Sequence, residues 1–237
     1  MKIKLPTIDQ IEQNQNPQAW DILNHTLYRL CAENYKHETV QEIIGKVILI
    51  SRSYSASLQR HQNQKVKDDL DAEFFIDHIA PCFQNSNIDL KLNELKSESL
   101  TLDSFLKSLE LHFYLVSILR DVNKKDQRSF SSKYLHFHLP DLFFIYDTRA
   151  ASALKHFVKK PDLPASLLKL ITAKKVDETY AVFSYACYSL MNDISNKHKI
   201  ALTGKSMSPR KLDHLLLSVA DENIRVAKKR KLLTTNR

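Results

Sequence analysis

Apolar residues recur every three or four positions along most of this chain, which is the period of an amphipathic α-helix. The longest stripe follows Thr101, a residue type that caps helices, and this stripe predicts a central helix. Its members are Leu102, Phe105, Leu106, Leu109, Phe113, Val116 and Leu119. Shorter stripes predict helices that begin near Pro17, after a Thr39–Glu42 capping box, near Asp69, near Asp162, near Tyr180 and at Pro209.

The prolines and polar segments between these stripes predict the domain organisation. Pro81 is expected to end the helix that starts near Asp69, residues 84–89 to form a loop, and residues 81–99 to separate two lobes. The chain has only 2 glycines, which argues against tight β-hairpins and glycine-rich phosphate loops. We therefore expect an all-α fold, a single domain over residues 1–237, with N-terminal helices in residues 1–85 and a second lobe in residues 98–237.

The stretch between residues 127 and 149 concentrates the chemically active side chains. A helix capped by Asp126 is expected over residues 127–138, because Pro140 lacks a backbone donor and disfavours helical geometry before it. One apolar face of this helix should point inward, and it includes a lysine. Its members are Phe130, Lys133, Tyr134 and Phe137, and His136 flanks them.

A short apolar run, residues 142–146, leads to Asp147 at the N-cap position of a helix predicted over residues 148–158. Burial lowers the pKa of a lysine and frees its amine to attack carbon, whereas a helix N-terminus favours an ionised carboxylate. The pair suits cleavage of an N-glycosidic bond, with Lys133 as nucleophile and Asp147 stabilising positive charge on the sugar. The structural alternative is that Lys133 extends to solvent and Asp147 only caps its helix.

The order of helix, lysine, hairpin, apolar run, aspartate and helix resembles the catalytic segment of the helix-hairpin-helix DNA glycosylases, specifically the 8-oxoguanine DNA glycosylase fold and its divergent prokaryotic relatives. The resemblance covers residues 127–149 closely and the remainder only as a helical chain of suitable length. It implies two closely packed lobes around a cleft, with Lys133 as the nucleophile and Asp147 as the assisting carboxylate. The family has glycines just before the lysine, where this chain has Ser-Phe-Ser-Ser at residues 129–132.

On this hypothesis a modified base is flipped into an aromatic-lined pocket, and arginines bind the flanking phosphates of DNA. The expected pocket wall consists of Phe130, Tyr134, His136, Phe137 and Tyr146. The expected DNA contacts are Arg52, Tyr54, Arg60, Arg128 and Arg149. Core packing and solvated surface positions are the structural alternatives for both groups.

The net charge of +8 favours an anionic partner, and DNA is the partner expected here. The 3 cysteines are widely spaced and the histidines lack the spacing of a zinc site, so neither a metal nor another cofactor is expected. The N-terminus has no apolar signal core and no run reaches the length of a membrane span. We therefore expect a protein of the cytoplasm, or of the nucleus in a eukaryote, that does not bind membranes.

The sequence leaves three functions open. The first is a DNA glycosylase, with or without lyase activity, that serves genome repair or defence against modified phage DNA. The second is a non-catalytic basic helical module that binds nucleic acid or protein in a repair or defence assembly. The third is a helical ribonuclease, indicated only by scattered pairs such as Arg60–His61.

Overall fold

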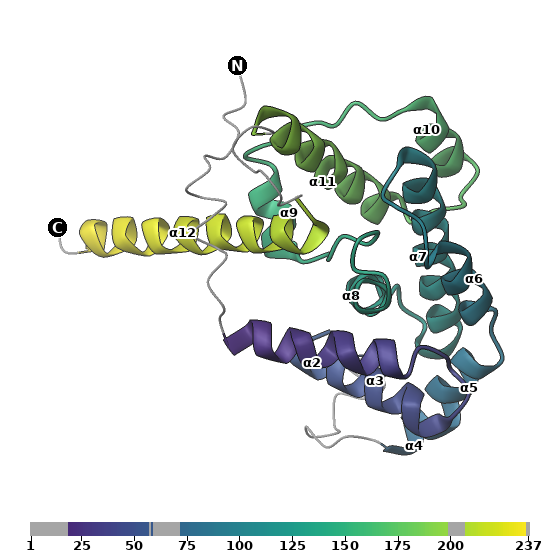
Figure 1. Ribbon diagram of the computed structural model, residues 1–237. Coiled ribbons are helices and arrows are strands. Elements are labelled where there is room, and N and C mark those ends of the chain that lie inside the picture. Colours follow the sequence, from purple (N-terminus) through teal and green to yellow (C-terminus); the bar gives the residue numbers. More distant parts are fainter. Residues whose placement is uncertain (1–18, 57, 59–71, 199–206, 236–237) are drawn as a thin grey trace.

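The computed structural model describes residues 19–56, 58, 72–198 and 207–235, and the regular secondary structure of these residues is entirely helical (Figure 1). This confirms the predicted all-α class. The helices are α2 (Ala19–Glu33), α3 (Val40–Ser53), α4 (Ala72–Phe74), the π-helix η2 (Phe75–Ile79), α5 (Ala80–Gln84), α6 (Ile88–Leu95), α7 (Leu102–Asn123), α8 (Arg128–His138), α9 (Thr148–Leu154), α10 (Ala165–Thr172), α11 (Glu178–Lys197) and α12 (Pro209–Thr235).

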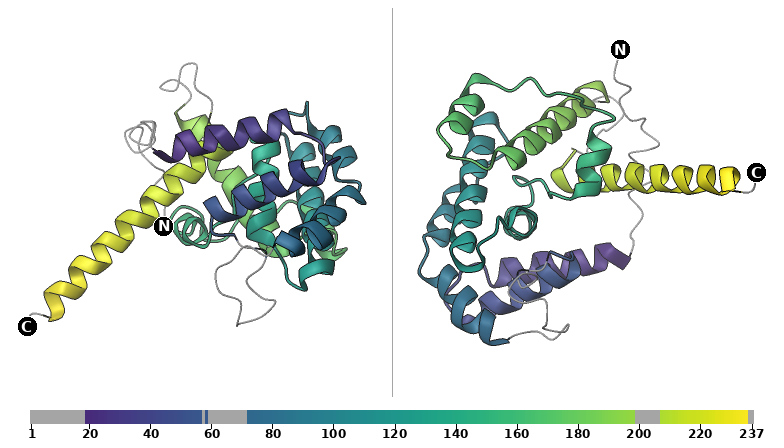
Figure 2. Two further views of the ribbon diagram at one scale, coloured as in Figure 1. Left: turned by 90° about the horizontal axis from the view of Figure 1, so that it is seen from below. Right: turned by 180° about the vertical axis from the view of Figure 1, so that it is seen from behind.

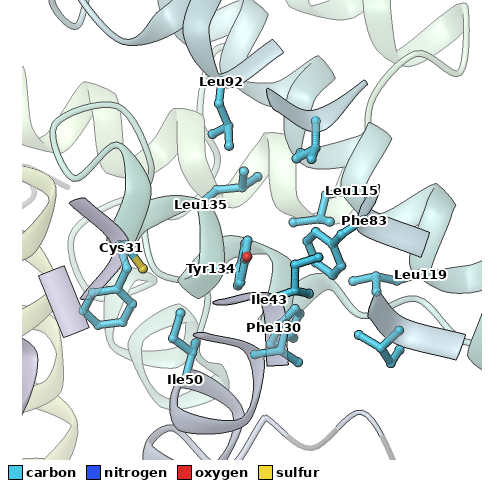
Figure 3. Packing of buried hydrophobic residues seen from close by; sticks show 14 of the residues in the cluster. Cys31, Ile43, Ile50, Phe83, Leu92, Leu115, Leu119, Phe130, Tyr134 and Leu135 are labelled. Atoms are coloured by element: carbon cyan, nitrogen blue, oxygen red, sulfur yellow. The ribbon is translucent and has the colours of Figure 1, made fainter. Parts of the chain in front are cut away.

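Two buried hydrophobic clusters share α7 between them. The C-terminal half of α7 packs into a first core with α2, α3, η2, α5, α6 and α8. Its N-terminal half contributes Phe105 and Leu109 to a second core formed with α9, α10, α11 and α12. Figure 3 shows the first core gathered around Tyr134 of α8. The long stripe after Thr101 thus forms a helix that joins both cores.

The helix α8 lies in the middle of the molecule, with α2 and α3 on one side and α9, α11 and α12 on the other (Figure 1; Figure 2). It contacts α2, α3 and α7 directly. Every residue from Phe130 to His138 is buried. A helix that is covered on all sides belongs to the interior of a fold, so its polar side chains must find partners within the protein.

Local capping signals place the start of two long helices as the sequence predicts. Thr39 caps α3 and Thr101 caps α7, and both form capping boxes with the third residue of the helix. The helix α7 ends at Asn123, and its C-cap Lys124 has a left-handed backbone (φ 59°). Each box satisfies backbone donors that the first turn leaves without intrahelical partners.

The segment between Pro81 and residue 99 differs from the prediction. Pro81 does not end a helix but lies in α5, which continues without a break from the π-helix η2. A π-helical turn is one of the places where a helix departs from its regular hydrogen-bond ladder. Most of the expected lobe boundary at residues 81–99 is also helical, because Ile88, Leu92 and Leu95 recur at helical spacing and bury one face of α6. The loop shrinks to residues 85–87.

The predicted cap of α8 is wrong as well. Gln127 occupies the N-cap position and makes no side-chain capping bond. The exposed carboxylate of Asp126 instead pairs with Arg120 near the end of α7. An ion pair with the preceding helix thus replaces the local capping bond.

The helix α12 begins in the second core and its C-terminal part extends away from the rest of the molecule (Figure 1; Figure 2). Its first half packs against α9 and α11. This arrangement brings Arg210 to Tyr54 at the end of α3, although 156 positions separate them in the sequence.

Candidate functional site

Lys133 is buried in the middle of α8, where its side chain is only 2% exposed. The Nζ atom donates to the backbone carbonyl of Tyr146 at 2.8 Å and to Ser129 Oγ at 2.6 Å, with a longer contact of 3.4 Å to the Ser129 carbonyl. The lysine therefore ties its own helix to the chain segment that precedes α9. The alternative that Lys133 extends to solvent is wrong.

Burial lowers the pKa of Lys133 to about 8, because the apolar surroundings disfavour the charged ammonium. The charges of Asp147 and Asp213 act in the opposite direction, and Arg149 lowers the pKa further. Within the described residues Lys133 has no carboxylate within 4 Å. About a tenth of the lysine is then the free amine at pH 7.

Asp147 is the N-cap of α9, as the sequence predicts. Its backbone is extended, and its Oδ1 atom accepts hydrogen bonds from the amides of Arg149 at 2.8 Å and Ala150 at 3.4 Å. Arg149 bridges two carboxylates, with Nε at 3.5 Å from Asp147 and Nη1 at 3.7 Å from Asp221 of α12. The cap thus lies in a small network of charges at the start of α9.

A third carboxylate, Asp213 of α12, joins this network and was missed by the sequence analysis. It is 4% exposed, and burial raises its pKa to about 6. Its Oδ2 accepts a hydrogen bond from Arg210 Nη1 at 3.0 Å. The usable sequence signal was an acid enclosed by the apolar positions Leu212, Leu215 and Leu216, where a charge needs a specific partner.

The residues predicted to form the pocket wall are mostly packing residues. Phe130, Tyr134 and Phe137 lie in the first core (Figure 3 shows Phe130 and Tyr134). His136 is buried and hydrogen-bonded on both ring nitrogens, to Tyr28 Oη at 2.6 Å and to the Phe143 carbonyl at 2.8 Å. Burial lowers the pKa of His136 to about 3, so the ring is neutral at physiological pH.

Tyr146 lies apart from the other wall residues, because its ring packs edge-on against Phe183 of the second core. Two cavities in the described part of the chain have volumes of about 520 and 300 Å³. The larger is lined by Asp77, His78, Pro81, Cys82, Asn85, Ile118, Asp121, Val122 and Lys124. The smaller is lined by Phe113, Arg120, Asp126, Arg128, Ile171, Lys174, Val176, Asp177, Glu178 and Thr179. Neither cavity reaches Lys133 or the predicted wall.

The predicted DNA contacts have different environments. Arg52 is exposed at the end of α3, whereas Arg60 lies outside the described residues. Arg128 is half-buried and pairs through Nε with both oxygens of Asp177, at 2.8 and 2.9 Å. Tyr54 is partly buried, and its ring centre lies 5.9 Å from Lys133 Nζ. The structure thus brings Tyr54 to the lysine, and it commits Arg128 to an ion pair.

Among the described residues no group of three or more His, Cys, Asp or Glu side chains is arranged to hold a metal ion. None of the helices in this part of the chain combines the length and the apolar character of a membrane span. Comparisons of the chain with protein-family models, with curated proteins and with solved structures found no match.

Proposed function

We propose that the protein is a DNA glycosylase, with an associated lyase activity, whose nucleophile is Lys133. The observation that carries this proposal is a buried lysine, with its pKa lowered to about 8, in the same charge network as the helix-capping Asp147. A nucleophilic amine needs a lowered pKa to be free at neutral pH. The net charge of +8 supports a polyanionic substrate.

In the proposed reaction the Lys133 amine attacks C1′ of the target nucleotide. The C–N bond to the enzyme forms while the N-glycosidic bond breaks, and the bonding electron pair leaves with the base. The sugar gains positive charge in the transition state, and the Asp147 carboxylate stabilises that charge. The product is an aminal with Nζ on C1′, whose sugar ring then opens: the C1′–O4′ bond breaks, O4′ takes up a proton, and the Nζ lone pair forms the C=N bond. The resulting imine is the intermediate from which a lyase cleaves the strand.

Lys133 must first release the Tyr146 carbonyl and Ser129 Oγ, because these atoms hold its Nζ in the resting structure. A flipped base also needs space that the two cavities do not supply. We therefore expect substrate binding to open the surroundings of Lys133. Many enzymes likewise rearrange when substrate binds and complete their active sites only then.

The test is covalent trapping with borohydride. The protein is incubated with labelled oligonucleotides that contain an abasic site or one of a panel of modified bases. We expect an adduct with the wild type, none with Lys133→Met, and a slower reaction with Asp147→Asn. Lys46→Met is the matched control, since Lys46 is also buried with a pKa near 8 but bonds only the carbonyls of Asn34 and Lys36. An adduct that persists in Lys133→Met would contradict the proposal.

The second candidate is a non-catalytic basic module that binds nucleic acid or protein. The observation that favours it is the set of hydrogen-bond acceptors around the Lys133 ammonium. A buried lysine with a purely structural role needs such acceptors. In this case no oligonucleotide forms an adduct, and a folded Lys133→Met variant binds DNA with unchanged affinity and salt dependence.

A further inference from the structure

Asp213 carries an oxygen atom that the fold leaves without a partner. Among the described residues, Oδ1 of Asp213 is the buried carboxylate oxygen that accepts no hydrogen bond, while Oδ2 is bound by Arg210. Buried polar atoms are normally satisfied, so an unsatisfied carboxylate oxygen calls for a functional explanation. A carboxylate with one open oxygen can still accept a proton or a hydrogen-bond donor.

Tyr54 connects this carboxylate with Lys133. Arg210 Nη1 binds Asp213 at 3.0 Å and also donates to Tyr54 Oη at 3.3 Å. While the hydroxyl of Tyr54 binds Arg210, the ring of Tyr54 faces Lys133, whose Nζ lies 5.9 Å from the ring centre. The charge of Lys133 lowers the pKa of Asp213, and that of Asp213 raises the pKa of Lys133. The two groups therefore respond to each other's protonation.

The two carboxylates of the site differ in what they bind. Oδ1 of Asp147 is occupied by two amides at the start of α9 and is approached by the Arg149 guanidinium. Oδ1 of Asp213 has no partner, and burial disfavours the charged form of this group. Where environments divide two carboxylates in this way, the bonded one stabilises charge and the desolvated one handles the proton.

We propose that Asp213 accepts the proton that Lys133 must lose before its amine attacks carbon, an assignment that rests on the proposed glycosylase function. In the resting structure the two groups lie more than 4 Å apart, so the transfer follows release of Lys133 from the Tyr146 carbonyl and Ser129 Oγ. The proton then moves from the ammonium of Lys133 to Oδ1 of Asp213, giving a neutral amine and a neutral carboxylic acid. The amine lone pair then forms the bond to C1′. At an abasic aldehyde the carbonyl π bond breaks, its oxygen leaves as water after taking up two protons, and an imine remains.

The charges that face Asp213 come from three helices. They are Arg210 on α12, Lys133 on α8, and Asp147 with Arg149 at the start of α9. A purely electrostatic role is the alternative, and it predicts the opposite effect of removing the carboxylate. Loss of that negative charge would lower the pKa of Lys133 and accelerate attack at neutral pH, whereas loss of the proton acceptor would slow the attack.

The experiment measures the single-turnover rate of adduct formation with an abasic oligonucleotide and cyanoborohydride between pH 6 and pH 9. We expect Asp213→Asn to react about 100-fold more slowly than the wild type at pH 7, at the lower end of general-base effects. The pH dependence should change as well: the wild type should keep its rate down to about pH 6, where Asp213 itself takes up a proton, whereas in Asp213→Asn the rate should already fall below the lysine pKa of about 8, because only the free amine reacts. Asp193→Asn, which removes an exposed carboxylate of α11, is the control and should match the wild type.

An Asp213→Asn rate equal to or above that of the wild type would overturn the assignment while leaving the proposed function intact. No adduct with the wild type would overturn both. An NMR titration of the Lys133 Cε resonance without DNA tests the coupling separately and reports folding of the variant. The wild type should show inflections near pH 6 and pH 8, and Asp213→Asn should lose the lower one; a wild-type curve with a single inflection would also overturn the assignment.

Discussion

Lys46 and Lys133 are buried to a similar degree but differ in the side chains around them. Both side chains are almost fully buried, and burial lowers the pKa of each to about 8. Lys46 binds the carbonyls of Asn34 and Lys36 and so closes the connection between α2 and α3. The charges of Asp89 and the capping-box Glu42 act on Lys46, as those of Asp147 and Asp213 act on Lys133, but of the two lysines only Lys133 is coupled to a carboxylate that has an open oxygen.

The lowered pKa of Lys133 predicts how stability depends on pH. Because the lysine pKa is about 8 in the folded protein and about 10.5 when unfolded, the unfolded state binds more protons between these values. Burial of the charge therefore costs stability fully below pH 8, and this cost is relieved as pH rises. Relative to Lys133→Met, the wild type should gain about 2 kcal/mol in free energy of unfolding between pH 7 and pH 10. Urea denaturation at both pH values measures it, and a constant difference would contradict the lowered pKa.

At the scale of elements, α8 and the segment before α9 are joined by short polar side chains. Ser132 Oγ accepts from the Tyr146 amide at 3.0 Å and donates to the Ser129 carbonyl at 3.0 Å. Lys133 binds the Tyr146 carbonyl from the same helix. Both polar groups of the Tyr146 backbone are thus held by α8, and this fixes where Asp147 begins α9.

We predict that Ser132→Ala lowers the free energy of unfolding by about 1–3 kcal/mol, because the Tyr146 amide loses its partner. Trapping by Lys133 should slow as well, since the cap of α9 is no longer held in register. Ser218→Ala, at an exposed position of α12, is the matched control and should change stability by less than about 0.5 kcal/mol. Equal effects of the two substitutions on unfolding would contradict the role given to Ser132.

At the scale of the whole molecule, polar side chains run through both cores. Asp89 accepts from the Nδ1 atom of His37 at 2.5 Å, and His37 Nε2 lies 2.7 Å from Tyr134 Oη inside the first core. His112 stacks on Tyr180 in the second core, with ring centres 3.6 Å apart. Burial lowers the pKa of all four of the histidines His37, His112, His136 and His138.

Acid should therefore destabilise the protein. A histidine with a lowered pKa in the folded state takes up its proton mainly on unfolding, so stability falls as pH drops below about 6.5. For His112, whose pKa is about 4, the loss between pH 7 and pH 5 is about 2 kcal/mol. The raised pKa of Asp213 has the opposite effect, because this carboxyl favours the folded state as pH falls. It is a single group, whereas four histidines destabilise the folded state in acid.

Urea denaturation at pH 7 and pH 5 tests this expectation. In His112→Gln the difference in stability between the two pH values should shrink by about 2 kcal/mol relative to the wild type. His25→Gln, at an exposed position of α2, should leave the difference unchanged. A wild type that is equally stable at pH 7 and pH 5 would contradict neutral burial of these histidines.

The sequence alone determined the features that depend on neighbours along the chain. Helical periodicity predicted the all-α class and the long stripe of α7, and cap residues placed the starts of α3, α7 and α9. The buried face of α8 predicted the burial of Lys133 and the direction of its pKa shift. These features follow from hydrogen bonds and side-chain spacing within a few turns, which a local pattern records.

Only the tertiary structure decided which distant groups surround the lysine. Tyr54, the residue after α3, lies next to Lys133, and Arg210 of α12 binds both Tyr54 and Asp213. Nothing in their local sequence indicates that meeting. The same holds for Asp126. Its position in the sequence predicts a helix cap, but in the structure it forms an ion pair with Arg120. The physical reason is that packing of whole helices sets such long-range contacts, and the charges then exert their influence across space rather than along the chain.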